Sequence, residues 1–136
     1  MKKITSLHLA VLCAILLGSN QLKAQYGEKP QITTITGKID HYDPNIPITI
    51  SVKRLGLNQD DIQAKSDKDG NFIATFESYI PLDVVIGYRR TNFWVLLHPA
   101  DSLFVHFDGR SRSRPELLES IKFGGDRAKT NQFAAK

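Results

Sequence analysis

The stretch IQAKSDKDGNFIATF, residues 62–76, decides the fold class, because it is typical of two strands joined by a tight turn. Apolar and polar side chains alternate over 62–66, and 72–76 is rich in β-branched and aromatic residues, as in strands with one buried face. Asp69 and Gly70 lie between the two segments, and Asp-Gly in this setting is a strong sequence signal for a β-hairpin. The stretch therefore predicts antiparallel β structure.

Similar short segments recur on both sides of this hairpin. Seven candidate strands lie between residues 33 and 107, and clusters of Gly, Pro, Asn and Asp separate them. The segment ITISVK, 48–53, alternates almost perfectly, while 84–88 is more continuously apolar and is predicted to be central in a sheet. The segment 93–97, the most apolar stretch after residue 24, is predicted to be a fully buried core strand. Turn signals about every ten residues favour a sandwich over alternating βαβ units. We expect an all-β fold, an antiparallel β-sandwich of about seven to eight strands.

The last part of the chain has a different character. Residues 109–114 form a basic, serine-rich loop, and Pro115 opens a short helix over 115–120 that Ser113 and Glu116 are predicted to cap. A second helix is predicted to start near Asp126 and to be cut short at the last residue. We therefore place a β-sandwich domain at 32–125, after a flexible lead-in at 25–31, and the start of a helical linker at 126–136.

Residues 1–24 have the pattern of a cleavable signal peptide. Lys2 and Lys3 precede an apolar run at 7–17, and a polar segment then leads to Ala24. The run is too short to cross a bilayer as a helix, which takes about 20 residues. A lipoprotein signal using Cys13 would need a small residue before it, and Leu12 is bulky. We expect cleavage after Ala24 and a periplasmic or extracellular chain with no membrane span.

Export changes the charge of the chain. Removing Lys2, Lys3 and Lys23 from 18 Lys and Arg leaves 15 against 14 Asp and Glu, so the formal charge falls from +4 to +1. The basic balance of the whole chain therefore does not indicate a nucleic-acid partner. The single cysteine, Cys13, leaves with the signal peptide, so the domain must fold without a disulfide.

No motif in the mature chain predicts a metal, a cofactor or a catalytic centre. A calcium loop with Gly70 at its sixth position would place Lys65 and Phe76 where acidic residues are needed, so a hairpin turn is the better interpretation. There is no Gly-x-Ser-x-Gly elbow for a nucleophilic serine. The spacing of the remaining histidines does not bring zinc ligands together. These histidines are His41, His98 and His106.

Two features are candidates for binding a partner. The only concentration of basic residues could hold a phosphate or an acidic partner, but arginines spaced by serines in a loop are more often a solvated connector. Trp94 could expose its ring to a ligand, although a buried core position is the more probable interpretation of its strand. The candidate partner-binding residues are Arg110, Arg112, Arg114 and Trp94, with Arg89 and Arg90 elsewhere in the chain.

Four segments together resemble a known arrangement. They are TGKI at 36–39, DKDGNF at 67–72, LHPADSL at 97–103, and FGGD at 123–126 followed by Asn131. In this order and spacing they resemble the N-terminal β-sandwich domain of Bacteroidetes thiol–disulfide oxidoreductases of the TlpA/ResA type. The resemblance covers roughly residues 32–132 and implies a signal peptide and a β-sandwich that precede a helical linker and a thioredoxin fold.

The redox chemistry of that family belongs to a Cys-x-x-Cys in the thioredoxin fold, and the mature part of this chain has no thiol. We therefore expect no enzyme activity, whether the chain is a naturally short relative or a fragment. The resemblance implies an exported accessory domain that binds or positions a protein partner in the cell envelope. The alternative is an envelope ligand- or glycan-binding module similar to the carboxypeptidase-regulatory-like sandwiches, which share the strand–Asp-Gly–strand pattern.

Overall fold

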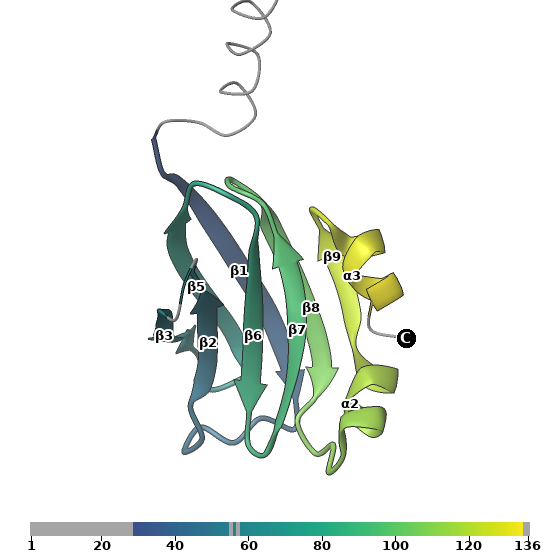
Figure 1. Cartoon of the computed structure of the whole chain (residues 1–136). Coiled ribbons are helices and arrows are strands. Elements are labelled where there is room, and N and C mark those ends of the chain that lie inside the picture. The colour runs from purple at the N-terminus through teal and green to yellow at the C-terminus, as the bar shows by residue number, and fades with distance from the viewer. Residues whose placement is uncertain (1–28, 55, 57, 135–136) are drawn as a thin grey trace, which may run out of the picture.

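The computed structural model describes residues 29–54, 56 and 58–134, and shows two β-sheets packed face to face (Figure 1). The predicted signal peptide lies outside the described residues. One sheet has the strand order β4-β5-β1-β8-β9 and the other the order β3-β2-β6-β7. The elements are β1 Gln31–Asp40, β2 Ile48–Lys53, β3 Gln59–Gln63, β4 Lys65–Ser66, β5 Asn71–Ser78, β6 Leu82–Tyr88, β7 Thr91–Leu97, β8 Ser102–Asp108, α2 Arg114–Ser120, β9 Lys122–Gly125 and α3 Ala128–Ala134.

The prediction of an all-β sandwich with short helices near its C-terminal end is confirmed. The described residues form nine strands rather than seven to eight, because the segment before the Asp-Gly turn is divided into two strands. Gln59–Gln63 pairs with β2 in one sheet, and Lys65–Ser66 pairs with β5 in the other. One pairing is not antiparallel: β1 runs parallel to β8, from Thr34 opposite Ser102 to Asp40 opposite Asp108.

The Asp-Gly turn has the conformation that its sequence requires. Gly70 has a φ of 81°, in the left-handed region that glycine tolerates best. The Asp67 carboxylate accepts hydrogen bonds from the backbone N–H groups of Asp69 and Asn71, both at 2.9 Å. A hydrogen bond from the Asn71 side chain, together with these two backbone bonds, lowers the pKa of Asp67. The segment is a hairpin turn that β4 and β5 close.

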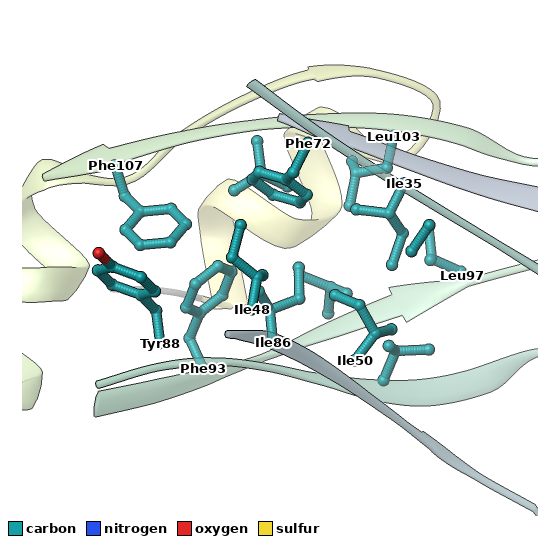
Figure 2. Packing of buried hydrophobic residues seen from close by; sticks show 14 of the residues in the cluster. Ile35, Ile48, Ile50, Phe72, Ile86, Tyr88, Phe93, Leu97, Leu103 and Phe107 are labelled. Atoms are coloured by element: carbon teal, nitrogen blue, oxygen red, sulfur yellow. The ribbon is translucent and has the colours of Figure 1, made fainter. Parts of the chain in front are cut away.

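The core lies between the sheets, where alternate side chains of each long strand meet (Figure 2). Phe93 is one of the largest side chains in this core: its ring contacts Phe107 edge-on, with 5.5 Å between ring centroids, and Phe123 at 6.3 Å. The prediction that 84–88 is central in a sheet is confirmed, since β6 lies between β2 and β7. The prediction that 93–97 is a fully buried core strand is wrong. Every second residue of β6 and β7 points outward, and Trp94 is 48 % exposed. A two-layer sandwich without covering helices buries only one face of each sheet.

Gly37, in the TGKI segment, permits the closest packing in the five-stranded sheet. A Cβ at this position would lie 2.3 Å from Cε1 of Phe72 and 2.5 Å from the carbonyl oxygen of Val105. Real Cβ atoms do not come this close to other heavy atoms, and the carbonyl belongs to the ladder between β1 and β8. The missing side chain therefore lets the Phe72 ring cross over β1 into the core.

Two short helices pack beside β7, β8 and β9 (Figure 1). The predicted cap of the first is confirmed, since Ser113 Oγ accepts from the Glu116 N–H at 3.4 Å and Leu117 is buried. The second helix is held by Asn131, whose side chain accepts from Leu96 N–H at 2.8 Å and donates to Leu96 C=O at 3.1 Å. Among the described residues, no helix has the length and apolar character needed to span a membrane.

Candidate anion-binding site

Four arginines gather around one open pocket at an end of the sandwich. The pocket has a volume of about 710 Å³. Its walls come from the loop between β1 and β2, the turn between β6 and β7, and the loop between β8 and α2, which lie together at the lower end of Figure 1. The lining residues are Ile46, Arg89, Arg90, Arg110, Ser111 and Arg112.

The two arginines of the β6–β7 turn are placed by a tight hairpin. Tyr88 pairs with Thr91 in the ladder, so Arg89 and Arg90 alone form the loop. Arg89 has a φ of 54°, a conformation that glycine would adopt at lower cost. The positive φ is what a two-residue hairpin loop requires, and it fixes where the Arg89 side chain leaves the turn.

Arg110 is fixed by the carboxylate of Asp108. Its Nη2 lies 3.1 Å from Asp108 Oδ2 and its Nε 3.4 Å from Oδ1, and its backbone N–H also donates to Oδ1 at 2.9 Å. These bonds to Arg110, with a smaller contribution from His41 at 3.1 Å, hold the pKa of Asp108 well below its usual range. In return the carboxylate raises the pKa of Arg110. The pair stays ionised at ordinary pH, and the guanidinium is held in one orientation.

Arg89 is positioned more loosely, and two other arginines of the pocket form no ion pair within the described part of the chain. Arg89 Nη2 lies 3.7 Å from Asp43 Oδ2, and its guanidinium lies 5.6 Å from the centroid of the Tyr88 ring. Arg90 and Arg112 are exposed and form no ion pair with any residue that the structure describes. The pocket thus offers guanidinium groups that are free to form bidentate bonds with a carboxylate or a phosphate.

The predicted binding residues divide into three places. Arg110 and Arg112 line the pocket together with Arg89 and Arg90, whereas Arg114 begins α2 and does not line it. Trp94 lies on the outer face of the four-stranded sheet and takes no part in this site. The contributions of Ile46 and Ser111 were not predicted, because nothing in their local sequence indicates a site.

Two of the three described histidines, His41 and His106, each contact a single carboxylate and do not form a cluster. His41 Nδ1 is 3.1 Å from Asp108 Oδ1, and His106 Nε2 is 2.9 Å from Asp40 Oδ2. Within the described part of the chain, no three His, Cys, Asp or Glu side chains are arranged to hold a metal ion. The absence of metals and cofactors from the function of this protein stays a prediction.

Comparison of the chain with models of protein families, with curated proteins and with solved structures found no match. The similarity to the N-terminal domain of TlpA/ResA-type oxidoreductases therefore rests on the four segments alone and stays a prediction.

Proposed function

We propose that this chain is an exported, non-catalytic binding module that holds an acidic segment of a protein partner in its arginine pocket. The observation that carries the proposal is the convergence of Arg89, Arg90, Arg110 and Arg112, from two loops far apart in the sequence, on one open pocket. Arginine is the side chain best suited to hold carboxylates through paired hydrogen bonds.

Two arginine side chains of this cluster are available to a ligand. Asp43 and Asp108 pair with Arg89 and Arg110, and the Glu116 carboxylate accepts from the Arg112 backbone N–H at 2.9 Å. The guanidinium groups of Arg90 and Arg112 form no ion pair with a described residue, so they can form charge-assisted bonds with a carboxylate of a partner. Ile46 adds an apolar contact, which favours a partner segment that carries apolar side chains beside its acidic ones.

The sequence resemblance supports a thioredoxin-fold protein as the partner, with this chain in an accessory role. We propose that the chain itself has no redox activity, because its mature part contains no thiol. An insulin-reduction assay with the purified chain and a dithiol should show no turnover above the dithiol alone. Turnover that follows the concentration of the chain would contradict the non-catalytic proposal.

Removing the two unpaired charges should weaken binding without unfolding the domain. We expect the double variant Arg90→Gln, Arg112→Gln to bind a fluorescent peptide of alternating glutamate and leucine at least tenfold more weakly, as two charge-assisted contacts of about 1 kcal/mol each imply. Fluorescence anisotropy at low and high salt measures this, and the affinity of the unaltered chain should fall as salt rises.

The matched control is Lys122→Gln, Lys129→Gln, which removes the same formal charge from exposed positions on β9 and α3. It should bind the peptide as the unaltered chain does. Equal binding of a peptide with lysine in place of glutamate, or equal losses in the two double variants, would show that the pocket is not an acidic-segment site.

A further inference from the structure

The outer face of the four-stranded sheet carries a second group of side chains suited to binding. Trp94 is the only tryptophan in the sequence, and it projects outward from β7 with 48 % of its surface exposed. In the ladder it lies opposite Val85 of β6, which in turn lies opposite Ser51 of β2. The ring therefore stands at one side of a flat surface formed by three strands.

This surface is open beside the ring. Gly87 lies on the outward side of β6 between Thr49 and Asn92. A Cβ built on Gly87 would meet only Thr49, at 3.8 and 3.9 Å, which is ordinary contact. The missing side chain is thus not needed for close packing, unlike that of Gly37, and it leaves free space next to Trp94.

The polar groups around the ring include both hydrogen-bond donors and acceptors. Lys53 Nζ lies 5.9 Å from the centroid of the Trp94 ring and donates to the Gln59 side chain. Asp83 is exposed on the same face of β6. The charges of Lys53 and Asp83 balance each other near the ring, so no excess of positive charge favours an anionic ligand.

We propose that this face binds a neutral saccharide, with a pyranose ring stacked on Trp94 over the free space at Gly87. The electron-rich face of an indole attracts the C–H groups on the apolar side of a sugar ring. The Thr49 hydroxyl and the Asn92 amide, on either side of Gly87 in the ladder, then meet the sugar hydroxyls. The site lies on the outer sheet face, whereas the arginine pocket lies at the end of the sandwich, so the two proposals stand independently.

The other exposed aromatic residue on an outer sheet face does not share these features. Phe104 of β8 is 44 % exposed on the five-stranded sheet, but the space beside it over Gly124 is filled by its own side chain, with Cβ and Cδ1 3.6 Å from where a Gly124 Cβ would be. An aromatic ring over a strand glycine stabilises a sheet. Phe104 therefore serves as a matched control for Trp94.

The single tryptophan makes the test direct, because its emission reports on this face alone. Titration of the full chain with cello-, malto-, xylo- and manno-oligosaccharides should give a saturable change in emission with at least one of them. Phe104→Ala should keep that response. Gly87→Val, which fills the space beside the ring with a residue well suited to a strand, should weaken the affinity at least tenfold. Calorimetry should show the same loss in Trp94→Ala, with unchanged circular dichroism as evidence of folding.

No response to any neutral oligosaccharide at millimolar concentration would overturn the proposal, as would binding that survives in both Trp94→Ala and Gly87→Val. A response to oligogalacturonate alone would also overturn it, since the charge balance predicts a neutral ligand. The double variant Arg90→Gln, Arg112→Gln should bind saccharide normally, so failure at this face is distinguishable from failure at the arginine pocket.

Discussion

Replacing Phe93 by alanine is expected to lower the free energy of unfolding by about 3–5 kcal/mol. The side chain is 2 % exposed and lies between the two sheets, where its ring contacts Phe107 and Phe123 edge-on (Figure 2). The substitution removes apolar surface from the core, leaves a cavity that the strand backbones cannot close, and breaks two aromatic contacts. The free energy of unfolding of a domain of this size is about 5–15 kcal/mol, so this one substitution removes a large part of it.

Urea unfolding, followed by the emission of Trp94, measures the loss of free energy. A lower midpoint urea concentration with an unchanged slope would show that the substitution changes stability and not the compactness of the unfolded state. Phe133→Ala provides the control, because that ring is 83 % exposed on α3 and should cost less than about 0.5 kcal/mol. A loss below about 1 kcal/mol for Phe93→Ala would show that the Phe93 ring is not closely packed in the core.

Local pattern was sufficient to predict the sandwich, because alternation and turn residues act within a few positions of each other. The Asp-Gly turn and the Ser113 cap are as predicted for this reason. The parallel pairing of β1 with β8 was not predicted, since it joins segments more than sixty residues apart and no local signal records it. The division of 59–66 between two sheets was missed because strand-switching depends on the position of both partners rather than on these residues.

The candidate site shows the same limit. The sequence shows that 110–114 is basic. It does not show that Arg89 and Arg90 of the β6–β7 turn lie beside this loop. Their convergence follows from strand direction: β6 and β8 run the same way in their sheets, so the loops that follow them end at the same end of the sandwich (Figure 1). The burial of Trp94 was predicted wrongly because all five residues of FWVLL are apolar, so no polar residue marks the positions that face outward. Only the packing of this strand against the other sheet shows which of its side chains face the core.

Replacing Asn131 by leucine is expected to lower the free energy of unfolding by about 3–4 kcal/mol, although the two side chains are similar in size. Asn131 is 2 % exposed, and its amide makes the two hydrogen bonds to Leu96 that a neighbouring strand would otherwise make. Leucine leaves a backbone donor and a backbone acceptor unpaired in a partly buried place, at about 1–3 kcal/mol each. Faster hydrogen exchange of the Leu96 amide and of the α3 amides should accompany the loss.

Asn131→Asp separates the hydrogen bonds from simple packing. An ionised carboxylate can still accept from the Leu96 N–H but faces the Leu96 carbonyl oxygen, whereas the protonated form can donate to it as the amide does. Both this contact and burial raise the pKa of the introduced carboxyl in the folded state. Its loss of stability relative to the unaltered chain should therefore grow as pH rises above about 4, the ordinary value for Asp. A deficit that does not change between pH 4 and pH 7 would contradict this account of Asn131.

Asn131 also covers part of the edge strand β7. β7 is the last strand of its sheet, and an edge strand with free N–H and C=O groups can pair with another chain. Because Asn131 occupies those groups at Leu96, the leucine variant should self-associate at concentrations where the unaltered chain does not, as sedimentation would show. Its arginine pocket, formed by loops at the other end of the sandwich from α3, should still bind the acidic peptide with unchanged affinity (Figure 1). The contribution of Asn131 is thus to the fold and its solubility, and not to the site.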